Sequence, residues 1–150
     1  MRSSLNTVTA QRYYWSDVAA AGACAALLSG IPSTFYAWVT RGDVLEATRA
    51  AGAMLIAPTS TDKELFIAAA LVHAGLSLFW ALVLVRWLPH RHTLIWAIIA
   101  LAGVAVLDLR VIGRLFPEIH ALSFWPQFAD HIAFGAVLGS VLVYRRKRRS

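Results

Sequence analysis

Long apolar runs separated by short polar segments dominate the pattern of this chain. Residues 18–40 form a run of 23 without a formal charge, and residues 65–85 contain a single titratable side chain, His73. Two further runs, 93–113 and 126–144, hold few polar groups. About 20 helical residues cross the roughly 30 Å hydrocarbon layer of a bilayer, so each run is long enough for one span. The pattern predicts an all-α, membrane-spanning four-helix bundle in a single domain, residues 1–150, with spans at about 16–39, 62–87, 93–114 and 126–144.

The segment between the first two spans predicts a short amphipathic helix. Asp43, followed three residues later by Glu46, is typical of a helix start, so we expect a helix over about 43–57. That helix lies on the membrane face or packs on the bundle. Thr61 and Glu64 have the spacing of a capping box and indicate the start of the second span.

Small residues recur at helical spacing in the first and last spans, where they allow two backbones to approach closely. These residues are Gly22, Ala26 and Gly30 in the first span and Gly135 and Gly139 in the last. Pro32 lacks an amide hydrogen and clashes with the preceding turn, so it predicts a kink in the first span. Four short helices enclose little volume, which favours association into a homodimer.

The charge distribution predicts how the chain sits in the membrane. The chain has 14 Lys and Arg against 8 Asp and Glu, and five of the basic residues form the run 145–149. With four spans both termini share a side; that side holds nine Lys and Arg, and the other side holds five. Positive residues mark the cytoplasmic side, which predicts that both termini are cytoplasmic. A basic tail near anionic headgroups explains the net charge of +6 without nucleic acid.

Ionisable residues gather in the outer half of the predicted bundle, near the non-cytoplasmic ends of three spans. They are Asp108, Arg110, Arg114, Asp130, His131 and His73, with Glu118 and His120 in the loop above. Charged groups inside a membrane are costly and normally face one another or a water-filled cavity. This cluster is therefore the candidate site of the chain.

Two interpretations of the cluster need no metal. In the first, Asp108 and Asp130 pair with Arg110 or Arg114, the histidines bond backbone carbonyls, and the cluster only stabilises the bundle. In the second, the cluster lines a binding site or path for a small solute or a proton. Arg110 and Arg114 are four residues apart on one helical face, which suits a grip on an anion. Histidine would supply titration near neutral pH.

A third interpretation makes the histidines ligands of a metal or haem. His73 and His131 would bind it, aided by His120 or Asp130, because imidazole is a good ligand for iron, copper and zinc. No His-x-x-x-His motif joins them, so the leading expectation contains no metal or other cofactor. The single Cys24 excludes an internal disulfide and a cysteine-rich metal site.

The chain shows no motif of classical catalysis. It lacks Gly-x-Ser-x-Gly, a P-loop, Gly-x-Gly-x-x-Gly and the zinc-protease motif. We therefore expect no enzyme, but an integral membrane protein that binds or passes a small solute or proton. The alternatives are a histidine-ligated metal or haem protein and a structural subunit of a larger membrane complex.

The second half resembles the YagU-type inner-membrane proteins, whose function is largely unknown. The residues that carry the resemblance are 116–118 (Phe-Pro-Glu), 122–126 (Leu-Ser-Phe-Trp-Pro) and 129–135 (Ala-Asp-His-Ile-Ala-Phe-Gly). The match covers about 30 residues, and the first half departs from it. The resemblance implies an inner-membrane location and a stress-related role, with no ligand residues to carry over. Short chains of this pattern also carry a "sodium:proline symporter" label, although such symporters have ten or more spans.

Overall fold

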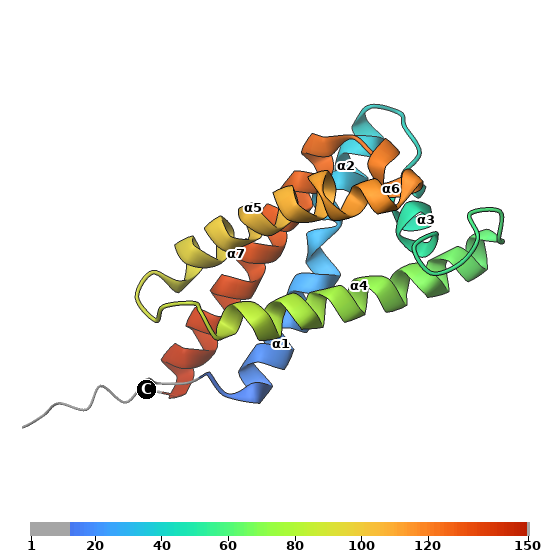
Figure 1. Cartoon of the computed structure of the whole chain (residues 1–150). Coiled ribbons are helices and arrows are strands. Elements are labelled where there is room, and N and C mark those ends of the chain that lie inside the picture. The colour runs from blue at the N-terminus through green and yellow to red at the C-terminus, as the bar shows by residue number, and fades with distance from the viewer. Residues whose placement is uncertain (1–12, 150) are drawn as a thin grey trace, which may run out of the picture.

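The computed structural model describes residues 13–149, which are helical with short connections and contain no strand. The elements are α1 (Trp15–Ser29), α2 (Ile31–Val39), α3 (Glu46–Gly52), α4 (Asp62–Val85), α5 (Thr93–Arg110), the 3-10 helix η1 (Ile112–Leu115), α6 (Pro117–Ala121) and α7 (Phe124–Arg149). α1 with α2, α4, α5 with η1, and α7 make the four long rods of the bundle (Figure 1). The predicted all-α four-helix architecture is confirmed.

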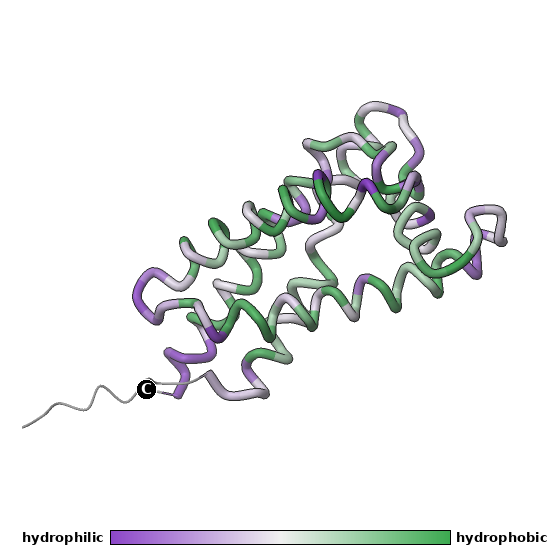
Figure 2. The backbone as a smooth tube through the Cα atoms, viewed as in Figure 1, coloured by the Kyte–Doolittle hydropathy of each residue, from purple (hydrophilic) through white to green (hydrophobic). Residues whose placement is uncertain are grey.

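The four rods have outer surfaces that suit lipid. Each is long and apolar enough to cross a membrane: Trp15–Val39, Asp62–Val85, Thr93–Leu115 and Phe124–Arg149. Only 22–33% of the residues in their most apolar windows are buried inside the molecule, so most of that apolar surface faces outward. Figure 2 shows hydrophobic residues along the middle of the bundle and hydrophilic ones at its ends. A water-soluble monomer does not leave so much contiguous apolar surface exposed, and the chain is a multi-pass membrane protein.

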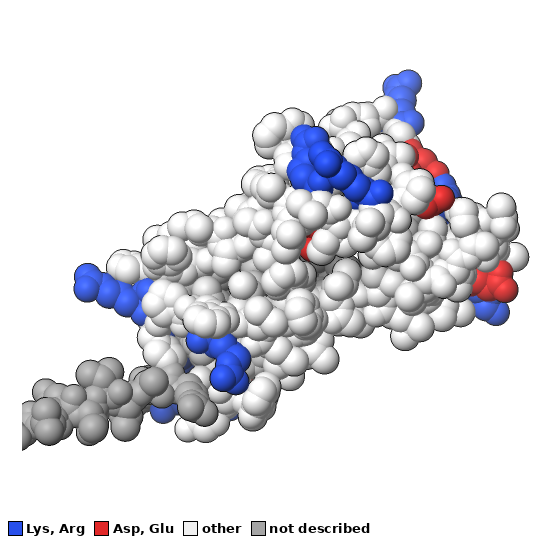
Figure 3. Space-filling model, in the orientation of Figure 1, with Lys and Arg blue, Asp and Glu red and all other residues white. Residues whose placement is uncertain are grey.

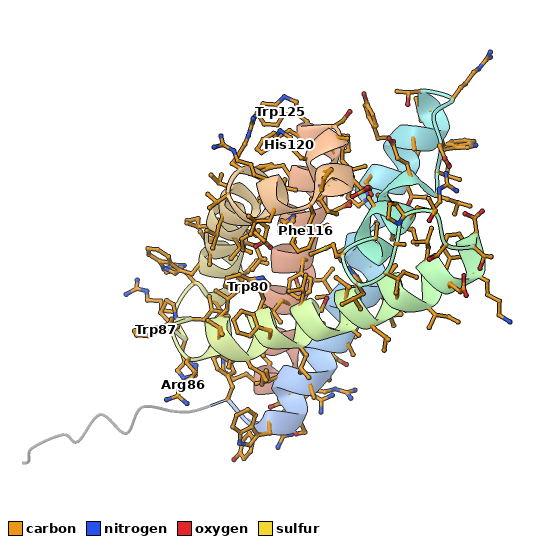
Figure 4. The ribbon with its side chains drawn as sticks, turned by 45° about the vertical axis from the view of Figure 1, so that its right-hand side comes forward. Trp80, Arg86, Trp87, Phe116, His120 and Trp125 are labelled. Carbon is orange, nitrogen blue, oxygen red and sulfur yellow. The ribbon has the colours of Figure 1, made fainter. Side chains whose placement is uncertain are left out.

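The two ends of the bundle differ in composition. The basic end is where α1 begins and α7 ends; the loop end is formed by α2, α3, η1 and α6. Figure 3 shows Lys and Arg near both ends, with an uncharged region between them. Trp87 and Trp125 mark the basic and loop ends in Figure 4, and both are exposed, as expected of tryptophans at the membrane–water boundary.

Three predicted boundaries need correction. The helix expected over 43–57 is shorter, α3, which packs against α4. The third span is α-helical only to Arg110 and continues as the tighter η1, so Arg110 and Arg114 do not share one α-helical face. The last helix continues through the basic run to Arg149 instead of ending near residue 144, because the arginines find partners on α1.

Glycines set the closest helix contacts. A Cβ atom built on Gly135 would lie 2.8 Å from the carbonyl oxygen of Ala97 on α5, and one on Gly139 would lie 2.8 Å from the Cα atom of Leu94. The predicted Gly135/Gly139 contact is confirmed and joins α7 to α5. In the first span only part of the stripe acts this way: Gly22 meets α4, while Gly30 has open space around it.

Gly30 instead marks a break between α1 and α2. Its amide points to the carbonyl of Leu28, and Pro32 occupies the first turn of α2, where its missing amide hydrogen costs no helical hydrogen bond. The kink predicted from Pro32 is thus a full interruption of the helix. It leaves backbone groups without helical partners in the middle of the molecule, and side chains from other helices take them up.

A network around Asp17 closes the basic end. Asp17 is 4% exposed and accepts hydrogen bonds from Nε of Arg145 at 2.6 Å and from an Nη of Arg149 at 3.0 Å. The guanidinium of Arg149 also lies 4.3 Å from the ring centroid of Tyr14. Part of the basic tail therefore ties α7 to α1, in addition to any role at lipid headgroups.

The turn between α4 and α5 joins the same end. Arg146 donates to the carbonyl oxygen of His90 at 2.7 Å, and the ring of Tyr13 lies 4.6 Å from that of His90. The hydroxyls of Tyr13 and Thr93 are 3.0 Å apart. Burial, and secondly the positive charge of Arg146, hold the pKa of His90 below its usual value.

The depressed pKa of His90 predicts a pH dependence of stability. The unfolded chain binds this proton more readily than the folded one, so stability is complete above about pH 6.5 and falls as pH drops below it. We expect the melting temperature in detergent to fall less between pH 7.5 and 5.5 in His90→Asn than in wild type. The same change in His92→Asn, an exposed neighbour, should leave the wild-type slope intact. Equal slopes in wild type and His90→Asn would contradict this assignment.

Candidate functional site

A cavity of about 240 Å³ lies between α4 and the α5–α7 pair, toward the loop end. Its polar lining includes His73, Asp108, Gln127, Asp130 and His131, together with the hydroxyl residues Ser29 and Ser77. Its apolar walls include Val72, Trp80, Leu101, Phe116 and Phe134. Figure 4 shows Trp80 and Phe116 in the space between α4 and the other helices. Four of the six residues predicted from the sequence therefore line one cavity.

Asp108 and His131 form its central pair. Nδ1 of His131 lies 2.9 Å from the carbonyl oxygen of Gln127, and Nε2 lies 3.3 Å from a carboxylate oxygen of Asp108. The side chains of His131 and Asp108 are 22% and 21% exposed, so neither is sealed from the cavity. Because α5 and α7 pack closely through glycine, a residue from each helix meets at the cavity wall.

The hydrogen-bond pattern of this pair has a chemical consequence. A carbonyl and an ionised carboxylate only accept hydrogen bonds, and a neutral imidazole donates from one nitrogen only. Satisfying both contacts of His131 therefore takes one further proton, carried by its ring or by Asp108. The pair can give that proton to a ligand or take one from it.

His73 and Asp130 serve the break between α1 and α2. Nε2 of His73 lies 2.7 Å from the carbonyl oxygen of Ala26, which the amide of residue 30 would bond in a continuous helix. A carboxylate oxygen of Asp130 accepts from the amide of Ser33 at 2.9 Å, in the first turn of α2. The break is thus supplied with a partner for the last turn of one helix and an acceptor for the first turn of the next. For these two residues the structure supports a stabilising role.

This role makes a prediction for Asp130. Asp130→Ala removes the acceptor at the start of α2, and loss of such a cap costs about 1 kcal/mol. Asp130→Asn keeps an oxygen in the same place and should cost less. Chemical denaturation in detergent micelles measures both. If Asp130→Ala were as stable as wild type, the carboxylate would not be holding the break.

Arg110 and Arg114 do not join the cavity wall. Both are exposed, and the guanidinium of Arg110 lies 4.4 Å from the ring centroid of Phe124. Neither forms the pairing with Asp108 or Asp130 that the structural interpretation invoked, since those carboxylates bond His131 and Ser33. Helix α5 ends at Arg110, and the following 3-10 turn carries Arg114 away from the cavity.

His120 also lies apart from the other two histidines of the metal interpretation. It is exposed on α6 and does not line the cavity (Figure 4). Among residues 13–149, no three side chains of His, Cys, Asp or Glu come together in a way that could hold a metal ion. The polar wall is a set of hydrogen-bonding groups.

Sequence reasoning missed three contributors to the site. Gln127 orients the ring of His131 through its backbone carbonyl oxygen. Every residue has such an oxygen, so the residue type at position 127 gives no signal. Trp80 and Phe116 form cavity walls, but in sequence they look like any aromatic residue in a span or at its edge. A signal existed only for Trp80, which lies seven residues, or two helical turns, from His73 and hence on the same face of α4.

The fold and the cavity together define a four-span α-helical membrane protein with a partly polar internal cavity. Comparisons with protein-family models, with curated proteins and with solved structures give no match for this chain.

Proposed function

We propose that this membrane protein binds a small molecule in the cavity and holds it by a hydrogen bond from the proton that Asp108 and His131 share. One observation carries the proposal: the ring of His131 lies between two oxygen acceptors at the cavity wall. Ligand sites are mostly apolar concavities with a few convergent polar groups, which describes this cavity.

The volume supports a ligand of modest size. Engineered apolar cavities of about 150 Å³ hold benzene, and the cavity here measures about 240 Å³. A single ring with substituents has room. Since much of the lining is apolar, the ligand has a largely apolar body with a polar group that faces Asp108 and His131.

We also propose that the loop end faces away from the cytoplasm, in an inner (plasma) membrane. The support is the excess of Lys and Arg at the basic end, where residues 145–149 extend α7. Cytoplasmic ends of spans carry such an excess. The cavity then lies in the outer half of the bilayer.

Filling the cavity tests the proposed function. Val72 lines the cavity, whereas its neighbour Leu71 is 64% exposed on the lipid-facing side of α4. Native mass spectrometry of the detergent-purified protein measures small molecules that remain bound. We expect Val72→Trp to lose a bound mass that wild type and the matched control Leu71→Trp retain. A wild-type chain without such a mass, or equal retention in both variants, would count against a binding function.

A further inference from the structure

Helices α4 and α5 both line the cavity but do not pack closely on each other. These two helices diverge from their connecting turn (Figure 1): α4 packs on α1 and α3, while α5 packs on α7. On either side of the gap between these helices, the cavity-lining Leu76 of α4 and Ile112 of η1 are 44% and 37% exposed. Both are apolar and belong to surfaces that face lipid.

The loop end of the cavity is covered by apolar side chains. Met54 follows α3, Phe116 precedes α6, and Ile119 and Leu122 lie on and after α6; all four line the cavity. A molecule from water would have to pass this apolar cover. A molecule dissolved in the bilayer meets the exposed apolar side chains of Leu76 and Ile112, so the geometry favours lateral entry.

The wall formed by α4 offers a buried hydrogen-bond donor without a protein partner. Within residues 13–149, the buried Nε1 of Trp80 has no hydrogen-bond partner, and Trp80 lines the cavity. An indole nitrogen only donates, and buried polar groups in proteins nearly always have a partner. The matching group on a ligand is an acceptor such as a carbonyl oxygen.

The spacing of the polar groups and the aromatic lining of the cavity restrict the class of ligand further. Trp80 lies seven residues from His73 along α4, roughly 10 Å at about 1.5 Å per residue. The cavity therefore offers the donor of Trp80 about two helical turns from His73, and the Asp108–His131 pair elsewhere in the same lining. Trp80, Phe116 and Phe134 contribute aromatic walls, which favour the face or edge of a flat ring.

We infer that the ligand is a flat, membrane-dissolved carbonyl compound that enters between α4 and α5. One carbonyl oxygen accepts from Nε1 of Trp80, and its opposite end faces Asp108 and His131. This inference rests on the proposed binding function and adds the chemical class of the ligand and its route. A para-quinone ring with an alkyl substituent has this shape and carries a carbonyl at each end.

The test uses decyl-substituted para-benzoquinone as the lipophilic probe and sodium benzoate as a flat, water-soluble comparator. Binding to the purified full-length chain is titrated by native mass spectrometry. We expect the quinone to bind and benzoate not to bind. Trp80→Phe should raise the dissociation constant about three- to tenfold, the effect of one hydrogen bond. Trp87→Phe, at an 82% exposed tryptophan, should leave it unchanged.

A second pair of variants tests the route and does not depend on the folding of Trp80→Phe. Ile112→Trp narrows the gap between α4 and η1, and we expect it to slow or abolish quinone uptake. Val111→Trp adds the same bulk to a 58% exposed neighbour outside the cavity lining and should not. Quinone binding that is equal in wild type, Trp80→Phe and Ile112→Trp overturns the inference.

The two proposals fail in different ways. If benzoate binds and the quinone does not, the cavity binds a ligand from water, so the binding function stands and the lipophilic class is wrong. If neither probe binds and wild type retains no small molecule that Val72→Trp loses, the binding function itself fails.

Discussion

Gly135→Ala is expected to destabilise the protein by about 2 kcal/mol, although alanine is the better helix former. The added methyl would lie 2.8 Å from the carbonyl oxygen of Ala97 and 3.0 Å from the Cα atom of Ile98, both backbone atoms that cannot turn aside. α5 and α7 must separate, and overpacking of this kind costs about 1–3 kcal/mol. Equilibrium unfolding in mixed detergent micelles measures the loss.

Gly103→Ala provides the matched control. Gly103 lies on α5, and within the described part of the chain no packing neighbour comes within 4 Å of the place that a Cβ atom would take, so the same substitution meets open space. Alanine then gains its helix propensity, worth about 0.5–1 kcal/mol. Opposite signs for the two substitutions support the glycine contact between α5 and α7. A stabilised Gly135→Ala variant would show that these helices are not in backbone contact.

Asp17→Ala is expected to cost about 2–3 kcal/mol and to loosen the basic end. Two arginines of α7 donate to this one buried carboxylate, and hydrogen bonds to charged groups contribute about 1.5–3 kcal/mol. The arginine side chains are 37% and 42% exposed, so water replaces part of what they lose. The estimate is therefore for the network as a whole rather than for each bond.

Asp62→Ala is the corresponding control at the surface. Asp62 begins α4, is 63% exposed and lies 3.7 Å from Arg49. Exposed ion pairs contribute little, so we expect a loss below about 1 kcal/mol. Protease cleavage within residues 145–149 offers a second measurement: the tail of Asp17→Ala should be cut faster than that of Asp62→Ala. Equal cleavage and equal stability would mean that the basic tail does not bind α1.

The sequence predicted the four spans because about 20 consecutive apolar residues have few other uses. It also predicted the contact at Gly135 and Gly139 and the capping box, in which Thr61 and Glu64 bond each other reciprocally. These features depend on spacing within one helix. The extension of α7 to Arg149 was missed because it depends on Asp17, which lies 128 positions before Arg145.

The sequence predicted how deep in the bundle the site residues lie, but not which of their side chains bond each other. Depth along a helix follows from the rise per residue, so the convergence of Asp108, Asp130, His131 and His73 was predictable. Which face each side chain occupies depends on helix rotation and on the break at Gly30. At the break, the carbonyl oxygen of Ala26 bonds His73, and the amide of Ser33 donates to Asp130. Asp108 and His131 then form the remaining pair at the cavity wall.

The polar wall therefore divides into two parts with different expected behaviour. His73 and Asp130 bond backbone atoms at the break, so substitutions there should act on stability. Asp108 and His131 bond each other and face the cavity, so substitutions there should act on binding. This division distinguishes a ligand site from a cluster that only stabilises the bundle.

The most direct test of this division combines two measurements on Asp108→Asn: retention of the bound molecule, and unfolding free energy after that molecule has been stripped away. Asparagine preserves size but cannot carry the exchangeable proton of the pair. We predict that bound mass is lost while the stripped protein unfolds within about 1 kcal/mol of wild type, the effect of one hydrogen bond. Full retention of the bound molecule with a large loss of stability would show that Asp108 and His131 only stabilise the bundle, and would contradict the account.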